Sequence, residues 1–333
     1  MSTNHGPARP DLRQRCGGVG LIELLVAVAI GLVMIAGAVT VYAKAKDAYA
    51  ALDANARLQE TARYAMGLIE ADIRMASFWG LTNRPDLITA NASLTFPNKC
   101  GGAAWITDVQ RFIDGTNNAY LSVTNCAAVY GGAQADSDVL VLRRASAQRI
   151  APQAAVVTAA NQDRVLIVTS RLAGQVFVPK DIGNAIPPGY ATADVAGQPP
   201  LADTRRLVVN AYYVSADSSV ATGYPALRRK TLVAGPTIQD DEIIPGVEDL
   251  QFQVGVDTSG DANVDAYFNP GSIPAGGTPV SVRVWLRLRA QDRDAAYLDN
   301  QPYEYADRTV SAPNDPFRRL LYAKTIHLRN ARR

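Results

Sequence analysis

Residues 16–25, Cys-Gly-Gly-Val-Gly-Leu-Ile-Glu-Leu-Leu, open an apolar run that continues to residue 43 and decides the fold. Within residues 19–43 the only charged side chain is that of Glu23. As a helix rising about 1.5 Å per residue, the run is long enough to cross a bilayer core of about 30 Å. It is longer than the apolar part of an ordinary secretory signal peptide, so we favour a retained membrane helix. A carboxylate inside such a helix is costly and therefore indicates a function.

The residues around this carboxylate resemble the cleavage motif of type IV prepilins. In that motif Gly is followed by an apolar residue, two further residues, Ile or Val, and Glu, which residues 18–23 match. The resemblance implies that the prepilin peptidase cuts after Gly18, that Val19 becomes the methylated first residue, and that the helix is kept. Glu23 would be the fifth residue of the mature chain and an assembly contact. Val19 departs from the Phe or Met usual at the first position.

The charges before the apolar run predict its orientation. Arg9, Arg13 and Arg15 stand against Asp11, and basic residues in excess before a membrane helix stay in the cytoplasm. We therefore expect a single-pass protein of the bacterial inner membrane with its C-terminal domain in the periplasm. The expected parts are a cleaved leader (1–18), a transmembrane and assembly helix (19–43), an amphipathic continuation of that helix (44–77) and a periplasmic β-rich globular domain (78–333).

Composition and cysteines describe the part beyond the membrane. A net charge of +2 and 19% charged residues are typical neither of nucleic-acid-binding nor of disordered chains. Cys16 would be lost with the leader, which leaves Cys100 and Cys126 in an oxidising compartment. We predict that they form a disulfide, and two unpaired buried thiols are the alternative. Closing the loop between them would contribute about 3 kcal/mol by the loop-entropy estimate.

The residues after the membrane run continue the helix and carry a second resemblance. An apolar stripe with spacings of three and four predicts one face packed against a domain: Leu58, Ala62, Ala65, Ile69 and Ile73. Residues 57–80 are similar to the block R-L-Q-E-x-x-R-[FY]-A…D-[IL]-R-x-A-x-[FY]-x-G of PilW-type minor pilins. Residues 227–229 with 246–252 resemble central strands of that family, and residues 328–330 resemble its C-terminus.

Beyond residue 80 the pattern changes to strands and loops. Apolar or alternating runs predict strands at residues 138–143, 164–169, 206–214, 250–256, 280–289 and 317–328. Stretches rich in Gly and Pro, at residues 183–203 and 269–279, separate some of them. The expected fold is α+β and pilin-like: a long N-terminal helix, membrane-spanning in its first half, packed on a mostly antiparallel β-sheet domain.

No sequence pattern indicates an enzyme. The chain contains no phosphate-binding Gly-rich loop, no H-E-x-x-H and no G-x-S-x-G motif, and the one histidine outside the leader, His327, has no sequence sign of a partner. We therefore expect neither catalytic residues nor an organic cofactor.

One acidic stretch resembles the first half of a calcium loop. Its polar side chains recur at every second position, which is the spacing of alternate oxygen ligands. The candidate ligands are Asp257, Ser259, Asp261, Asn263 and Asp265. The pattern then departs from a complete loop, with Ala262 at the turn position and Phe268 at the twelfth. An acidic turn between two strands, with Gly260 supplying the tight geometry, is the alternative.

A basic strand is the remaining candidate contact surface. Arg283, Arg287 and Arg289 alternate with apolar residues, as on the solvated face of a half-buried strand. Contact with DNA is the alternative, although nothing in the pattern indicates base readout, so no specific nucleic acid is expected. Trp285 falls on the arginine face and is a candidate subunit contact.

The resemblance implies a minor pilin that helps to prime the assembly of a type IV pilus and lies at or near the fibre tip. It would support pilus-dependent adhesion and twitching motility. The implied partners are other minor and major pilins, the prepilin peptidase and the inner-membrane assembly platform. Two alternatives stay open: a J-like pseudopilin of type II secretion, and a membrane-anchored periplasmic adhesin or binding domain that never enters a fibre.

Overall fold

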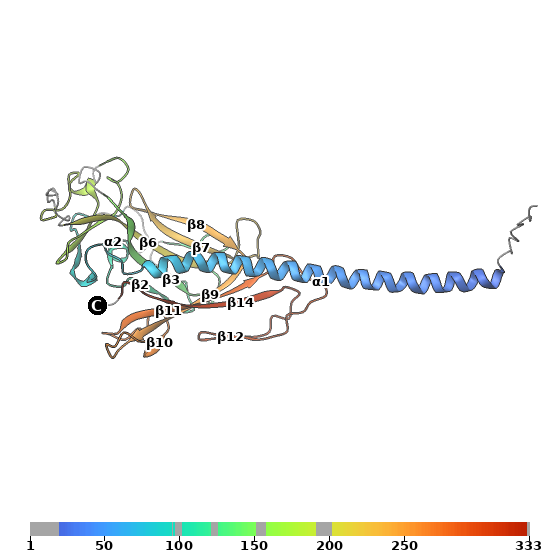
Figure 1. The fold of residues 1–333 in the computed structure, drawn as a ribbon. Coiled ribbons are helices and arrows are strands. Elements are labelled where there is room, and N and C mark those ends of the chain that lie inside the picture. The colour runs from blue at the N-terminus through green and yellow to red at the C-terminus, as the bar shows by residue number, and fades with distance from the viewer. Residues whose placement is uncertain are drawn as a thin grey trace, which may run out of the picture. The chain divides into compact units, whose positions relative to one another are not determined.

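A computed structural model of the chain describes residues 20–94, 96, 102–120, 126–150, 158–190 and 202–331. It divides into two compact units, Met1–Leu52 and Asp53–Arg333. Helix α1 (Leu21–Met75) belongs to both, since the division falls within it (Figure 1). Its end at Met75 lies two residues before the predicted boundary.

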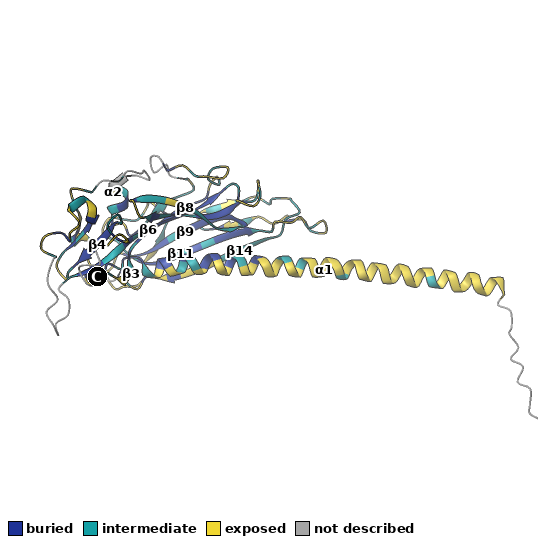
Figure 2. Ribbon diagram, turned by 90° about the horizontal axis from the view of Figure 1, so that it is seen from above, coloured by how far each residue is buried: buried dark blue, intermediate teal, exposed yellow. Residues whose placement is uncertain are grey.

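The second part of α1 is amphipathic, as its sequence predicts. All five residues of the predicted apolar stripe are buried, together with Met66. Figure 2 shows these buried positions on the part of α1 that lies along the strands. The helix has Glu23 in its first turn and Arg74 in its last, which complements the helix dipole at both ends. It ends where Ser77 adopts a left-handed conformation with φ of 63°.

The larger sheet has eight strands. Its main path runs β1-β5-β4-β6-β3-β2, and β7 joins β6 and carries β8. All pairings are antiparallel except that of β1 with β5. The strands are β1 (Ile88–Ala90), β2 (Ile113–Thr116), β3 (Val139–Arg149), β4 (Leu166–Thr169), β5 (Gly174–Phe177), β6 (Asp203–Ser215), β7 (Ala226–Val233) and β8 (Thr237–Pro245).

The smaller sheet has four antiparallel strands in the order β10-β9-β11-β14, and a separate hairpin pairs β12 with β13. These strands are β9 (Val247–Asp257), β10 (Ala266–Phe268), β11 (Thr278–Arg289), β12 (Tyr303–Tyr305), β13 (Arg308–Val310) and β14 (Arg319–His327). Short helices complete the domain: η1 (Pro85–Leu87), α2 (Gly102–Thr107) and η3 (Pro179–Ile182).

One hydrophobic core joins α1 to both sheets. It contains Ile69 and Ile73 of the helix, Val209 of β6 and Val284 of β11, each fully buried. At Gly115 of β2 a Cβ atom would lie 2.0 Å from the Val139 carbonyl oxygen of the paired strand β3, and 2.8 Å from the Phe252 ring of β9 in the smaller sheet. A mostly antiparallel β domain with a long N-terminal helix confirms the predicted α+β class.

Candidate functional site

The first part of α1 presents apolar side chains on all sides. Leu21, Ile22, Leu24 and Leu25, which surround Glu23, are between 56% and 78% exposed. Among the described residues, α1 is the one helix long and apolar enough to cross a membrane. Gly18 and Val19, the predicted processing site, lie outside the described residues. The apolar helix fits membrane anchoring, and Glu23 is the charge that its surroundings must accommodate.

At the other end of α1 a buried carboxylate joins the helix to the larger sheet. We call Asp72, Arg144, Asn210 and Tyr212 the Asp72 cluster. Arg144 of β3 donates Nη2 to Asp72 Oδ1 at 2.8 Å, and Nε lies 3.1 Å from the same oxygen. From β6, Asn210 Nδ2 and the Tyr212 hydroxyl donate to Asp72 Oδ2 at 2.5 and 2.6 Å. Because Asp72 is only 6% exposed, these contacts replace the water that its charge gives up.

The protonation state of Tyr212 supports this arrangement. Burial, and then the neighbouring Asp72 carboxylate, raise the pKa of the Tyr212 phenol. The hydroxyl therefore keeps its proton and remains a donor to Asp72. The sequence pattern did not predict this cluster, although Asp72 lies three residues after Ile69, on the buried stripe. An acidic residue at a position of the buried stripe could have indicated a buried carboxylate that needs a hydrogen-bonding or basic partner.

The same end of the helix also contacts the smaller sheet. Lys324 Nζ of β14 lies 2.5 Å from Glu70 Oε2, and Arg74 completes an i,i+4 pair with Glu70 at 2.6 Å. The hydrogen bond from Lys324 holds the pKa of Glu70 below its ordinary value. Burial acts in the opposite direction, and the hydrogen bond from Arg74 lowers the pKa further. Within the β domain, α1 is therefore held to both sheets by charged contacts.

The candidate calcium residues form a closed turn between β9 and β10. The Asp257 carboxylate accepts the backbone N–H groups of Ser259, Gly260 and Ala262 at 2.6 to 3.0 Å. Asp265 likewise accepts N–H groups from Thr258 and Ser259. In the part of the chain that the structure describes, no group of three or more His, Cys, Asp or Glu side chains is arranged to hold a metal ion. The geometry is that of the acidic turn, and calcium binding stays an untested prediction.

The turn should respond to pH. Hydrogen bonds from the Gly260 N–H, and then from Ala262 and Ser259, hold the pKa of Asp257 below its ordinary value. The carboxylate therefore stabilises the turn above an unfolded-state pKa of about 4, and this contribution is lost as the pH falls through the lower folded-state pKa. We expect the amide NMR signals of Gly260 and Ala262 to shift together below about pH 4. In an Asp257→Asn variant this shared transition should be absent.

The predicted disulfide falls partly outside the described residues. Cys126 is buried and disulfide-bonded, whereas Cys100 is not among the described residues. Its pairing with Cys100 stays a prediction. Non-reducing peptide mapping of the mature protein should recover the two cysteine peptides joined, and complete alkylation of both thiols in unreduced protein would contradict it.

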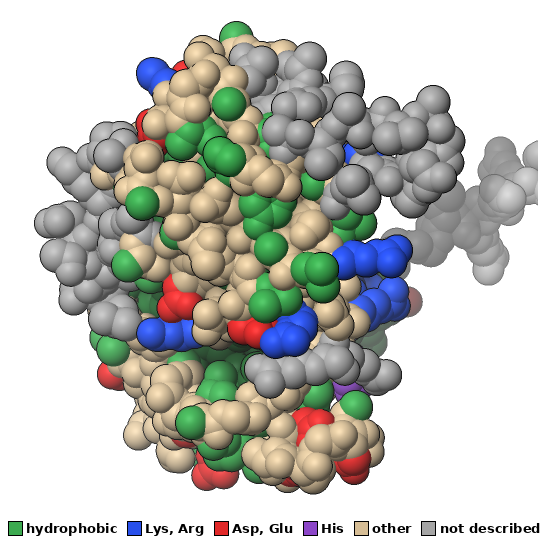
Figure 3. All heavy atoms as spheres, turned by 90° about the vertical axis from the view of Figure 1, so that its left-hand side faces the viewer, with side chains coloured by type: hydrophobic (Ala, Val, Ile, Leu, Met, Phe, Trp, Pro, Cys, Tyr) green, Lys and Arg blue, Asp and Glu red, His purple; other side chains and the backbone are tan. Residues whose placement is uncertain are grey.

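The structure separates the three arginines of the basic strand. Arg287 Nε lies 3.1 Å from Glu248, and Arg289 lies 3.9 Å from the same carboxylate. Arg283 instead stacks on Tyr267, with its guanidinium carbon 4.1 Å from the ring centre. Figure 3 shows basic side chains in separate groups, with acidic side chains between them, on another face of the molecule. The strand is therefore not a uniform basic surface.

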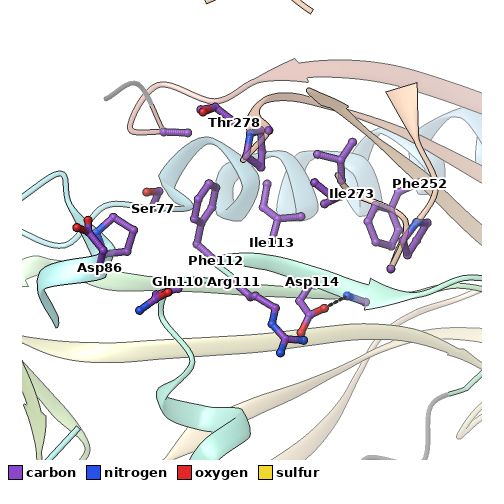
Figure 4. Close-up of a pocket in the computed structure, with 18 of the residues that line it drawn as sticks. Ser77, Asp86, Gln110, Arg111, Phe112, Ile113, Asp114, Phe252, Ile273 and Thr278 are labelled. Carbon is purple, nitrogen blue, oxygen red and sulfur yellow. Dashed lines mark hydrogen bonds between the residues drawn. The ribbon is translucent and has the colours of Figure 1, made fainter. Parts of the chain in front are cut away.

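The domain also contains a cavity of about 420 Å³ between β2 and the loop before β11 (Figure 4). Phe112, Ile113, Phe252 and Ile273 form its apolar walls. At its rim, Asp114 accepts the Gly115 N–H at 2.9 Å and lies 3.6 Å from the buried Arg143. The described lining residues include neither histidine nor cysteine.

Two protein-family models match this chain, one over its N-terminal helix and one over the C-terminal part of its β domain. Residues 211–330 match the family model described as Type IV Pilus-assembly protein W, and residues 13–39 match the model of the prokaryotic N-terminal methylation motif. The first match includes Tyr212 of the Asp72 cluster and the whole smaller sheet. No curated protein and no solved structure matches the chain. The two matches, one at each end of the chain, confirm its resemblance to the PilW-type, minor pilin-like proteins of type IV pili.

Proposed function

We propose that the chain is a minor pilin that joins a priming complex at the tip of a type IV pilus. The observation that carries the proposal is Glu23, a single carboxylate within an exposed apolar helix that bears the methylation motif. The matched families are structural components of pili, and the proposed role is accordingly assembly and not catalysis.

The order of events in assembly follows from the apolar surface of the helix. Before assembly, the apolar part of α1 holds the subunit in the inner membrane, with the β domain in the periplasm. After cleavage behind Gly18 by the prepilin peptidase, the assembly platform extracts the subunit and the same apolar surface packs against other pilin helices. Glu23 then pairs with the N-terminal ammonium of an adjacent subunit. In a water-free fibre core each charge alone would be expensive, so the pair favours the correct register.

Intact-mass analysis of purified fibres tests this proposal. We expect the chain to lack residues 1–18 and to begin with a methylated Val19. A Gly18→Val precursor should keep its leader, whereas a Cys16→Ser precursor, altered two residues away, should be processed normally. Deleting the gene should reduce the number of fibres while the major pilin stays in the membrane.

Other outcomes would identify the alternatives. A mature chain that begins after residue 43 would contradict the pilin assignment and leave a secreted periplasmic domain. A correctly processed chain found only with a type II secretion machine would identify a pseudopilin, which relies on the same helix physics.

A further inference from the structure

Part of the outer face of the smaller sheet is covered by the chain itself. Residues 290–318, which we call the cover segment, include β12 and β13 and lie on the side of this sheet that faces away from α1 (Figure 1). Asp249 of β9 accepts the Tyr305 hydroxyl at 2.6 Å and Arg308 Nη1 at 2.9 Å. Arg319 of β14 reaches Asp299 of the cover segment at 3.1 Å. These contacts fix the cover segment over the Asp249 end of the strands, and its Asp307 also accepts the side-chain amide of Asn269, just after β10, at 2.7 Å.

In the part of the chain that the structure describes, the cover segment makes no hydrogen bond or ion pair with Arg283 or Trp285, which lie farther along this face. The strand register places Arg283 opposite Thr325 and Trp285 opposite Ala323, so their side chains share one face. Tyr267 of β10, the edge strand on the far side of β9, stacks on Arg283. We call these five residues the Arg283 patch. Arg283, Trp285 and Tyr267 are partly exposed, and Ala323 and Thr325 are exposed.

Arg283 differs from the other arginines of this sheet in having no ion-pair partner among the described residues. Arg287, Arg289 and Arg319 all contact Glu248, and Arg308 of the cover segment contacts Asp249. Arg283 lies over the rings of Tyr267 at 4.1 Å and Trp285 at 5.8 Å. Its Nε has only a long contact with the Thr325 hydroxyl, at 3.4 Å. The guanidinium is thus oriented by two aromatic rings while its positive charge is unpaired.

This combination fits a protein contact. Trp, Tyr and Arg are the residues that most often dominate binding energy at interfaces, and an arginine held by stacking loses little freedom when it binds a carboxylate. We propose that the Arg283 patch is a docking surface for a carboxylate on the globular domain of a different pilin subunit. This proposal rests on the proposed function. Glu248 and Asp249 of the same sheet are already bound by arginines, and Asp307 of the cover segment accepts the side-chain amides of Asn117, Asn118 and Asn269. The missing partner is therefore assigned to another chain.

A nucleic acid fits the patch less well. Asp257, Asp261 and Asp265 lie in the turn that joins β9 to β10, at the end of β9 farther from Asp249. A phosphate backbone that extended from Arg283 in this direction would meet like charges, whereas a single protein carboxylate would not. Charge complementarity therefore favours a protein.

Photocrosslinking in living cells tests the proposal with the full-length chain. A Ala323→p-benzoylphenylalanine variant places the probe beside Trp285 without altering Arg283. We expect a crosslinked peptide from a different pilin subunit that contains Asp or Glu. Adding Arg283→Glu should reduce the crosslink yield at least about tenfold, and Arg283→Gln should reduce it less. Arg171→Glu, the same charge change at an exposed residue between β4 and β5, should leave the yield unchanged. Equal thermal melting of the solubilised variants would show that they fold.

The outcomes separate this proposal from the proposed function. Crosslink yield is measured in membranes and in sheared fibres, and cleavage after Gly18 is measured in the same samples. If the processed chain is present in fibres but its crosslinks do not depend on Arg283, the proposed docking surface is refuted and the proposed function is not. Crosslinks confined to nucleic acid, to a second copy of this chain or to a protein that is not a pilin also overturn it. Failure of cleavage refutes the proposed function, whatever the crosslinks show.

Discussion

Replacing Asp72 by alanine is expected to lower the free energy of unfolding of the β domain by about 3–5 kcal/mol. The change removes the common acceptor of Arg144, Asn210 and Tyr212, and it leaves an arginine largely buried without its partner. Breaking a buried ion pair from one side costs more than the pair itself contributes, because the remaining charge has lost both water and partner. Urea unfolding of the solubilised full-length chain, followed by tryptophan fluorescence, measures the loss.

The same helix offers a matched control for this prediction. Asp53 also pairs with an arginine, Arg57, at 2.9 Å, but both side chains are more than 60% exposed. Asp53→Ala should therefore change the free energy of unfolding by less than about 1 kcal/mol. If Asp72→Ala were as mild as Asp53→Ala, the cluster would not hold the helix to the sheet.

Replacing Glu23 by alanine should have two opposite effects. Membrane insertion should be kept or improved, because the apolar run loses its one charge. Incorporation into fibres should fall at least about tenfold, because an N-terminal ammonium of a neighbouring subunit would be left unpaired in a dry core. Cell fractionation and immunoblotting of sheared fibres measure the two effects separately.

Glu60→Ala is the control for Glu23→Ala, since it removes an exposed carboxylate from the later part of α1. This variant should enter fibres at the level of the unaltered chain. Wild-type amounts of the Glu23→Ala chain in fibres would mean that the carboxylate is not an assembly contact. The mechanism proposed for the helix would then be wrong.

The helix and the main strands could be predicted from the sequence because their hydrophobic periods are strong. Each of the six predicted strand regions overlaps an observed strand: β3, β4, β6, β9, β11 and β14. Strand β8 was not predicted, since Gln239-Asp-Asp-Glu242 is polar and lacks a strand-like apolar pattern. It forms a strand because Asp240 and Glu242 pair with Arg228 of β7, at 2.9 and 3.0 Å. A pattern of residues along one segment does not show which strand that segment will pair with, so it cannot predict such cross-strand ion pairs.

The candidate sites were less predictable for the same reason. The sequence singled out Glu23 because an isolated charge in an apolar run is conspicuous. It could not separate Arg283 from Arg287, because the carboxylate that neutralises Arg287 belongs to β9, far away along the chain. The Asp72 cluster likewise combines residues of α1, β3 and β6, which only the fold brings together.

The two helix contacts described above also have a mechanical meaning. Glu70 contacts the smaller sheet and Asp72 the larger one, and these residues are separated by about 3 Å along the helix axis. A tensile load carried by α1 therefore enters both sheets within a single helical turn. Because the hydrophobic core also packs this part of α1 against both sheets, we expect neither sheet to separate from the helix first and the domain to resist pulling as one body.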